Sequence, residues 1–305
     1  MQAATGTTLG RVRGVSVNED AFADHRNLLF TVAYEMLGSA SDAEDVVQET
    51  WLRWADVDHA TVRDHRAYLV RIVTRQALNR LRSLARRRED YVGEWLPEPL
   101  MTSPDVVDDV ELAESVSIAM LTVLETLGPT ERAVFVLREV FETPYDEIGE
   151  ALDKSPAAVR QIAHRARDHV AARRPRVPVS TTEQQEAVDR FLAAVLHGDL
   201  QGLLDVLAPD VVVIADGGGF AAAACRPIEG AERVAAFLML ASRTADFEVK
   251  AVWLNGSPAG RIDIGGELNT AVSLVVENGR MTRVYAIRNP HKLAWLDGVA
   301  PLTRT

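Results

Sequence analysis

The chain has 305 residues, a formal net charge of −11 and a single cysteine, Cys225. This length allows two or three domains with their own apolar cores, and a hydrophobic share of 47% is ordinary for globular proteins. One cysteine excludes an intramolecular disulfide framework and a cysteine-clustered zinc site. No apolar run could cross a bilayer and no signal-peptide core is present, so we expect a cytoplasmic protein without a membrane segment.

The negative total charge conceals two basic stretches. From Arg66 to Arg88 every charged residue is an arginine, and a second basic stretch runs from Arg160 to Arg176. Acidic residues gather at 42–49, at 105–114 and in the C-terminal third. The local field, and not the total charge, decides contact with nucleic acid. The distribution therefore indicates DNA binding confined to the two basic elements.

Three segments precede the second basic stretch. Residues 1–18 are rich in Gly and Thr without periodicity, and we expect a disordered tail. A helical pattern occupies 19–90, with a turn before Asp42 and a long basic amphipathic helix at its end. Residues 91–108 contain three prolines and are predicted to form a linker, which includes the string WLPEPL.

Residues 109–176 return to a helical pattern that ends as a helix-turn-helix. Tyr145–Leu152 is the predicted first helix, Ser155 is a suitable N-cap, and Pro156 fits the first position of the second helix. The predicted buried stripe of that helix consists of Val159, Ile162, Ala163, Ala166 and Val170. Its outer faces carry Arg160, Gln161, His164, Arg165 and Arg167. Such a helix can enter a DNA major groove, which we favour over a merely solvated basic helix.

The pattern changes again in residues 183–297. A helix at 183–197 is stopped by Gly198, and β-rich runs follow at 210–215, 246–254, 268–277 and 280–288. A second helix at 231–243 interrupts these runs, and Asn278-Gly279 supplies a hairpin turn between the last two. The order predicts an α+β cone in which a curved antiparallel sheet surrounds a pocket.

The first two units together resemble an extracytoplasmic-function (ECF) sigma factor of RNA polymerase. DAEDVVQETWLRWAD (42–56) and RAYLVRIVTRQALNRLRSLARRRE (66–89) are similar to its region 2, and the helix-turn-helix with AHRAR (163–167) is similar to its region 4. The last unit is similar to the SnoaL-like extension of one subgroup. WLPEPL (95–100), DGGG (216–219) and NPHKL (289–293) support that subgroup, which usually has an acidic residue in place of His291. The implied fold is multidomain: an all-α region 2 (19–90), a linker (91–108), an all-α region 4 (109–176) and a SnoaL-like cone (183–297).

The resemblance implies three binding surfaces of a transcription initiation factor. Core RNA polymerase would bind the outward face of the first acidic helix, which consists of Asp42, Asp45, Gln48 and Glu49. The −10 promoter element would bind the basic helix through Arg71, Arg75, Gln76, Asn79, Arg80 and Arg82. Arginines neutralise phosphates and side-chain amides bond base edges. The −35 element would bind the outward residues of the second helix of the helix-turn-helix.

The three short motifs imply an interdomain contact that regulates the chain in cis. Trp95 and Leu96 are large apolar residues in a segment where a free linker would be polar, so another surface must cover them. DGGG and NPHKL are the expected partners. The predicted regulatory residues are Trp95, Leu96, Pro97, Asp216, Gly217, Gly218, Gly219, Asn289, Pro290, Lys292 and Leu293.

Two alternatives remain open from the sequence. The C-terminal domain could be an enzyme with Asp216, Asp263, Tyr285 or His197 in its pocket, but no spacing demands acid–base chemistry. We expect no catalysis, metal or cofactor. The whole chain could instead be a helix-turn-helix regulator whose pocket senses a small molecule or is a relic enzyme. An ordinary repressor has no need of an acidic polymerase-docking face, which favours the sigma factor. A small ligand of unknown identity in the pocket is left open.

Overall fold

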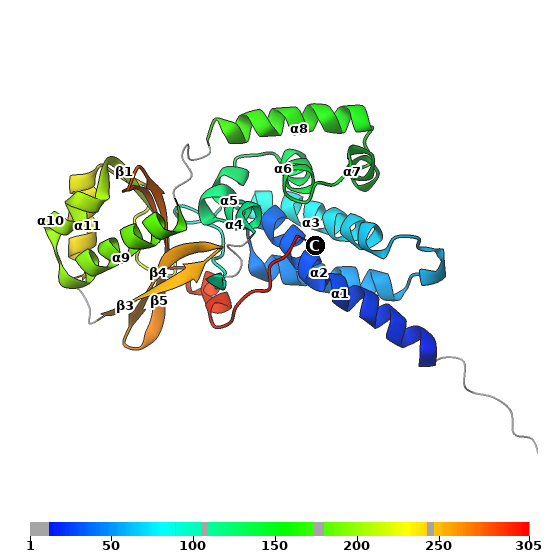
Figure 1. Cartoon of the computed structure of the whole chain (residues 1–305), viewed down its shortest axis with the longest axis horizontal. Coiled ribbons are helices and arrows are strands. Elements are labelled where there is room, and N and C mark those ends of the chain that lie inside the picture. Colours follow the sequence, from blue (N-terminus) through cyan, green and yellow to red (C-terminus); the bar gives the residue numbers. More distant parts are fainter. Residues whose placement is uncertain (1–11, 89, 105–108, 174–179, 243–246, 305) are drawn as a thin grey trace, which may run out of the picture.

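The computed structural model describes residues 12–88, 90–104, 109–173, 180–242 and 247–304, which form a helical half and a mixed half side by side (Figure 1). Residues 1–11 of the expected tail and 105–108 of the expected linker lie outside the described residues. Residues 12–18, which we expected in the tail, begin the first helix instead. Once packing has formed a helix, each further residue adds a hydrogen bond at low cost.

The N-terminal helical unit consists of α1 (Val12–Leu37), α2 (Ala40–Ala55), the short η1 (His59–Thr61) and α3 (His65–Arg88). Gly38 ends α1 with a φ of 65°. Ser39 then caps α2, since its side chain accepts a hydrogen bond from the backbone N–H of Asp42 at 3.1 Å. The buried Trp54 anchors the far end of α2.

The second helical unit consists of α4 (Val110–Ser115), α5 (Ile118–Leu124), α6 (Pro129–Phe135), the π-helical turn η3 (Val136–Val140), α7 (Tyr145–Leu152) and α8 (Pro156–Ala171). Asp153 makes the turn between α7 and α8 with a φ of 54°. The Ser155 hydroxyl accepts from Ala158 N at 3.3 Å and caps α8. All five residues of the predicted stripe of α8 are buried, which confirms the helix-turn-helix.

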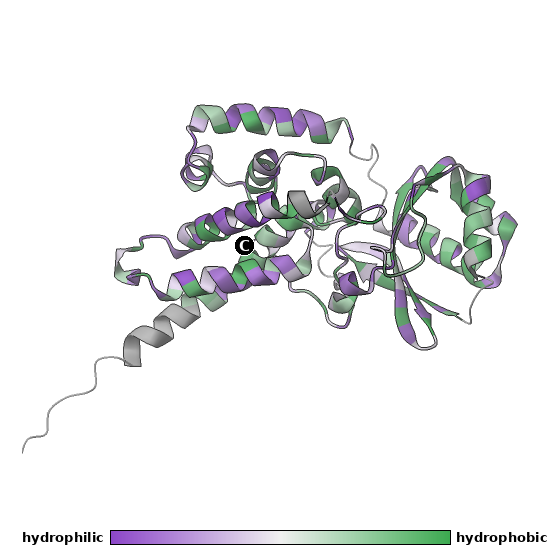
Figure 2. Ribbon diagram, turned by 180° about the vertical axis from the view of Figure 1, so that it is seen from behind, coloured by the Kyte–Doolittle hydropathy of each residue, from purple (hydrophilic) through white to green (hydrophobic). Residues whose placement is uncertain are grey.

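The two helical units share one apolar core. A single cluster of buried side chains runs from α1, α2 and α3 into α6, η3, α7 and α8. The long helices accordingly carry mixed polar and apolar residues (Figure 2). None of the described helices has the length and apolar character needed to cross a membrane. The two units are thus packed together rather than held apart by a linker.

The C-terminal domain places three helices on one face of a six-stranded sheet, counted over the described residues (Figure 1). Its elements are α9 (Thr181–His197), α10 (Leu200–Val206), α11 (Ala231–Ser242), β1 (Leu207–Asp216), β2 (Ile228–Glu229), β3 (Phe247–Leu254), β4 (Ser257–Ile264), β5 (Glu267–Glu277) and β6 (Arg280–Ile287). The strand order is β2-β1-β6-β5-β4-β3. The pairs are antiparallel as expected, except that β1 and β6 run parallel, because β6 returns beside β1 only after the meander.

The two faces of this sheet have different partners. The face under α9, α10 and α11 is filled by a buried apolar cluster that includes Val213, Leu274 and Val284. In the described residues, the interior of the cone is therefore lined by packed apolar side chains. The opposite face carries a second cluster in which Leu96 of the linker and Ile118 of α5 participate. The outer face of the sheet is thus the surface that joins the helical half.

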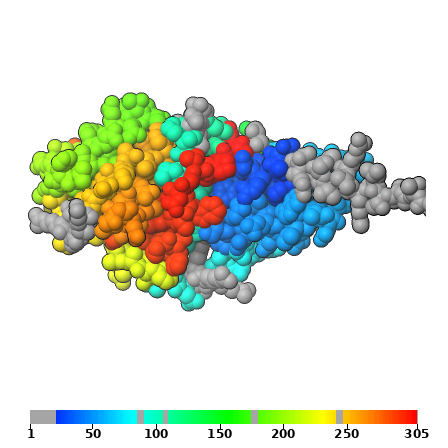
Figure 3. Space-filling model, turned by 90° about the horizontal axis from the view of Figure 1, so that it is seen from below, coloured from blue at the N-terminus to red at the C-terminus, as the bar shows by residue number. Residues whose placement is uncertain are grey.

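The C-terminal segment runs back over the helical half (Figure 3). After η4 (Pro290–Lys292) and η5 (Ala294–Leu296), Thr303 N donates to Thr31 Oγ1 of α1 at 3.0 Å. Arg304 Nε donates to Asp109, the N-cap of α4, at 2.7 Å. This segment consequently contacts both helical units.

A buried arginine joins the helical units from inside. Arg132 of α6 is 1% exposed, and its Nε and Nη2 donate to the carbonyl of Glu35 on α1 at 3.1 and 3.0 Å. Its Nη1 forms an ion pair with Glu125. Glu35 is itself fully buried, and among the described residues its Oε1 accepts from Ser115 while its Oε2 has no partner. Burial raises the pKa of Glu35 to about 8, so this side chain is mainly neutral at pH 7.

We expect Arg132→Met to lower the free energy of unfolding by about 3–5 kcal/mol, because it leaves Glu125 and the Glu35 carbonyl without their buried partner. The matched control is Arg165→Met on α8, whose exposed pair with Glu131 contributes about 0–1 kcal/mol. Urea unfolding followed by circular dichroism measures both. Equal, small losses in the free energy of unfolding would show that Arg132 does not stabilise the contact between the two helical units.

The second prediction concerns pH. The folded chain holds the Glu35 proton more tightly than the unfolded chain, whose pKa is near 4.5, and the folded pKa is about 8. The stability supplied by this proton is therefore complete below pH 4.5 and is lost as pH rises toward 8. The free energy of unfolding of the parent should fall over this window relative to that of Glu35→Gln, measured by urea unfolding at matched ionic strength. Parallel pH profiles would show that Glu35 is not the titrating group.

Candidate functional site

The WLPEPL segment lies against the outer face of the C-terminal sheet, and Leu96 is its anchor. Leu96 is 1% exposed, and its backbone N–H donates to Asp216 Oδ2 at 2.9 Å. Lys292 Nζ donates to the Leu96 carbonyl at 2.5 Å and forms an ion pair with Asp216 Oδ2 at 2.7 Å. The same ammonium lies 4.1 Å from the centre of the Trp95 ring. Residues of all three predicted motifs therefore meet here: Trp95 and Leu96 of WLPEPL, Asp216 of DGGG and Lys292 of NPHKL.

Tyr91 closes the other side of this contact. Its hydroxyl donates to Asp216 Oδ1 at 2.6 Å and accepts from Asn289 Nδ2 at 2.9 Å. Asn289 N in turn donates to the Asp216 carbonyl at 3.0 Å. Gly218 has a φ of 57°, and a Cβ there would lie 2.3 Å from Asn289 Nδ2 and 2.8 Å from the Tyr91 hydroxyl. The glycine in DGGG is therefore required by a close approach.

The same segment reaches the N-terminal unit through Glu98. Its buried carboxylate accepts from Ser39 Oγ at 2.9 Å and from the backbone N–H groups of Ala40 and Ser41 at 2.8 and 3.1 Å. These are free N–H groups of the first turn of α2, where a negative charge is also favoured by the helix dipole. The Glu98 carbonyl accepts from the Tyr34 hydroxyl at 2.7 Å. The linker thus bonds α1 and α2 on one side and the C-terminal domain on the other.

A hairpin turn of the C-terminal domain completes the junction. Asn255 lies between β3 and β4, and its Oδ1 accepts from Leu100 N at 2.9 Å. Its Nδ2 donates to the Tyr34 hydroxyl at 2.6 Å and to the Val116 carbonyl at 2.8 Å. One amide therefore touches the linker, α1 and the segment between α4 and α5. We call the contacts of Asp216, Lys292, Glu98 and Asn255 the junction.

Sequence reasoning missed Glu98 and Asn255. Glu98 lies inside WLPEPL but was not among the predicted regulatory residues. Asn255-Gly256 has the composition of a hairpin turn, which is the signal that could have found it. The following strand β4 was missed because Pro258 and Gly260 weaken its pattern.

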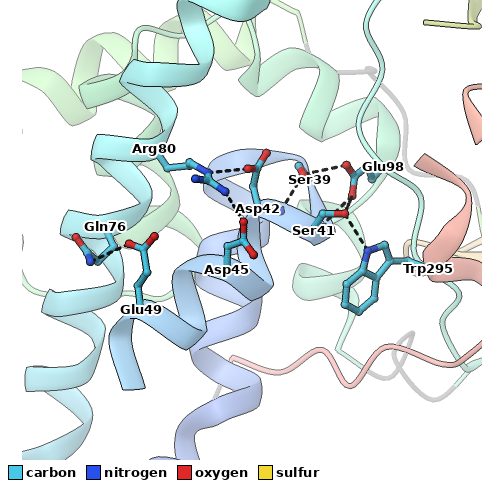
Figure 4. A network of polar contacts seen from close by, with 9 residues as sticks. All are labelled: Ser39, Ser41, Asp42, Asp45, Glu49, Gln76, Arg80, Glu98 and Trp295. Carbon is cyan, nitrogen blue, oxygen red and sulfur yellow. Dashed lines mark hydrogen bonds and ion pairs between the residues drawn. The ribbon is translucent and has the colours of Figure 1, made fainter. Parts of the chain in front are cut away.

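The predicted polymerase face and the predicted −10 face lie against each other (Figure 4). On α2, Asp45, Gln48 and Glu49 are exposed, whereas Asp42 is half-buried. Arg80 of α3 donates to Asp42 Oδ1 at 2.7 Å and forms a second ion pair with Asp45. We expected two separate surfaces, and the packing of α2 on α3 joins them instead.

Two more residues of the predicted −10 set, Arg71 and Arg75, contact α7 of the second helical unit. Arg75 donates to the carbonyls of Ala151 and Glu150 at 2.8 and 2.9 Å and to Asp153 Oδ1 at 2.8 Å. These groups lie at the C-terminal end of α7, where carbonyls lack helical partners. Arg71 lies 3.7 Å from Glu150. Asn79 and Arg82 are exposed.

The predicted −35 residues all lie on the exposed side of α8, namely Arg160, Gln161, His164, Arg165 and Arg167. The guanidinium of Arg160 lies 5.4 Å from the centre of the Tyr145 ring. Arg167 pairs with Glu139 at 3.1 Å, and His164 lies 2.8 Å from Asp168. In contrast to α3, this helix lies along one edge of the molecule (Figure 1). Its five predicted −35 residues are exposed.

The candidate catalytic residues are not assembled into a site. Asp216 is part of the junction, and Tyr285 is buried in the apolar cluster on the same outer face. Asp263 is engaged by Lys250 at 2.9 Å and Arg261 at 2.7 Å, while His197 is exposed at the end of α9. Within the described residues, no group of three His, Cys, Asp or Glu side chains is arranged to hold a metal ion. A groove of about 960 Å³ lies elsewhere, between α5 and α8 on one side and β5 on the other.

Comparisons with known proteins point to one family. The model of Sigma-70 region 2 matches residues 21–87, and that of Sigma-70, region 4 matches residues 117–170. The chain is 42% identical over 218 residues to the ECF RNA polymerase sigma factor SigJ of Mycobacterium tuberculosis, which covers 70% of each protein. It is 31% identical over 276 residues to the probable ECF RNA polymerase sigma factor SigI of the same species, covering 90% of this chain and 93% of that one.

A solved structure extends the likeness to the whole architecture. The crystal structure of the M. tuberculosis extracytoplasmic function sigma factor SigJ matches with a TM-score of 0.74 and 31% identity. The match covers 92% of this chain and 99% of the other. The C-terminal sheet domain is therefore included in the likeness, together with both helical units.

The ion pair of the junction yields a third prediction. Asp216→Asn and Lys292→Met should each lower the free energy of unfolding by about 3–5 kcal/mol, because each leaves one buried charge unmatched. The double variant should lose less than the sum of the two by at least about 1 kcal/mol, since it removes both charges. Thermal and urea unfolding of all four chains completes the cycle. Strict additivity would mean that the two groups do not interact.

Proposed function

This chain belongs to the extracytoplasmic-function family of RNA polymerase sigma factors, and on that premise we propose that its SnoaL-like domain regulates it in cis. As an alternative sigma factor, it directs core RNA polymerase to promoter DNA. The regulation would act by holding region 2 (α1–α3) and region 4 (α4–α8) in a fixed relation. The proposal also includes the predicted domain boundaries: region 2 at 19–90, the linker at 91–108, region 4 at 109–176 and the SnoaL-like domain at 183–297.

One observation carries the proposal: WLPEPL is bonded on both sides. Leu96 is held by Asp216 and Lys292 of the SnoaL-like domain, and two residues later Glu98 is held by the first turn of α2. Pro97 lies between these anchors and restricts the backbone. A movement of the SnoaL-like domain would therefore be passed directly to the helix that carries the proposed polymerase face.

The proposed DNA surfaces differ in their access. Arg75 bonds the end of α7 through three hydrogen bonds from its Nε and Nη2, so fewer of its N–H donors remain for a DNA phosphate. The ion pairs of α8, which join Arg165 to Glu131 and Arg167 to Glu139, instead stay within region 4. We infer that this arrangement favours a state in which the −35 surface is available and the −10 surface is partly withheld. Separation of regions 2 and 4 would release the second surface.

We expect a small ligand of this chain to bind in the groove between region 4 and the SnoaL-like domain, because packed apolar side chains line the described interior of the cone. Arg167 of α8 and Gln184 of α9 line that groove, so a bound molecule would touch both parts. We assign no catalytic role to the SnoaL-like domain, because Asp216, Asp263 and Tyr285 do not face a common cavity.

The test is in vitro transcription with core polymerase. Asp216→Asn should change the amount of transcript several-fold while initiation stays at the same promoters, since it loosens the junction and leaves α3 and α8 intact. The matched control is Asp263→Asn, which removes another buried carboxylate of the same domain whose ion pairs are made with Lys250 and Arg261 of the sheet. If both variants behave alike, loss of domain stability explains the effect and regulation through the junction is wrong.

A further inference from the structure

The acidic side of α2 and the basic side of α3 satisfy each other in this structure (Figure 4). Arg80 Nε donates to Asp42 Oδ1 at 2.7 Å, and Arg80 Nη2 bonds Asp45 Oδ2. Four positions along α3, Gln76 Nε2 donates to Glu49 Oε2 at 3.0 Å. Three of the side chains that we assign to polymerase are therefore bound to two of those that we assign to −10 DNA.

The exposure of these groups decides whether the contact can be exchanged. The Arg80 side chain is 30% exposed, and those of Asp42 and Asp45 are 20% and 58% exposed. Ion pairs that keep this access to water are weaker than fully buried ones, because water competes for both charges. The Arg132 guanidinium, at 1% exposure, has no such alternative. A charged partner from outside can thus replace Arg80 on α2 without unfolding the chain.

We propose that Arg80 couples polymerase docking to promoter binding, as a residue shared by the two surfaces. In the free chain, Asp42 and Asp45 hold its guanidinium. A basic surface of the polymerase that docks on these carboxylates displaces Arg80, whose fork of N–H donors then becomes available to a DNA phosphate. This inference rests on the proposed function, because it takes α2 as the helix that binds polymerase and α3 as the helix that binds −10 DNA.

The coupling has a direction that can be measured. Arg80 competes with polymerase for Asp42 and Asp45, so its removal should strengthen polymerase binding in the absence of DNA. Because coupling between two binding events is reciprocal, docking of polymerase should strengthen the contact of Arg80 with DNA. A residue that merely packed α2 on α3 would produce the opposite sign, since its loss would weaken both surfaces.

The position of Glu98 places this network next to the linker. Glu98 bonds Ser39 and Ser41, which directly precede Asp42, and Trp295 of the SnoaL-like side donates to Ser41 Oγ at 3.1 Å (Figure 4). The first turn of α2 is therefore fixed by groups from outside region 2. The Asp42 carboxylate is held in position for Arg80 by this support.

The experiment compares Arg80→Ala with Arg82→Ala, both in the full chain. Arg82 lies on the same helix, is exposed and belongs to the same proposed DNA surface. Affinity for core polymerase without DNA is measured by fluorescence anisotropy of labelled chain. Arg80→Ala should bind core about three- to tenfold more tightly than the parent, because two competing, partly exposed ion pairs are lost, whereas Arg82→Ala should bind like the parent. Both variants should reduce binding of the holoenzyme to a single-stranded −10 oligonucleotide.

The proposal fails if folded Arg80→Ala binds core no more tightly than the parent, or if its holoenzyme binds the −10 oligonucleotide as the parent does. Arg80→Lys keeps the charge but not the bidentate fork, and it should give an intermediate core affinity. Circular dichroism of each variant checks that the helices are intact. The result is separate from the regulatory proposal: junction variants can transcribe like the parent while Arg80→Ala still binds core more tightly, and the reverse is equally distinguishable.

Discussion

The buried carboxylate of Asp216 has no access to water, so the protein itself must supply every group that stabilises its charge. Lys292 supplies the countercharge, and Tyr91 and the Leu96 N–H supply hydrogen bonds. A buried ion pair of this kind contributes little net stability, but removal of one member is costly. The arrangement therefore specifies a position rather than adding strength. Leu96 can lie in only one place, and the linker, α2 and the sheet take their relation from it.

Polar groups recur wherever separate segments meet in this molecule. Tyr34 accepts from Asn255 and donates to the Glu98 carbonyl, and Arg132 crosses from α6 to the end of α1. Apolar contacts alone would permit sliding, because they depend weakly on direction. Buried hydrogen bonds prevent such sliding, because each has a defined geometry and its loss costs free energy. The joined state of the domains is thus sharply defined, while the exposed pairs of α2 and α3 remain open to exchange.

The sequence was sufficient for features with a local signature. The stripe of α8, the cap at Ser155 and the convergence of WLPEPL with DGGG and NPHKL could all be predicted from spacing or from motif resemblance. Glu98 could not, because its partners lie 58 residues away and nothing in WLPEPL indicates a helix N-terminus. The contact of Arg75 with α7 could not be predicted either, because the sequence of a basic helix does not show whether an arginine binds DNA or a protein carbonyl. Long-range pairing of polar groups is set by packing, which periodicity does not encode.

The order of the junction along the chain has a consequence for synthesis. Lys292 follows Leu96 by 196 residues. At about 5–20 residues per second, a ribosome needs roughly 10–40 s to pass from one to the other. In the later part of that interval, once α8 (Pro156–Ala171) has been made, regions 2 and 4 are complete but Lys292 does not yet exist. Every newly made molecule therefore passes through a period in which both helical regions are present and the contacts of Lys292 with the linker are absent.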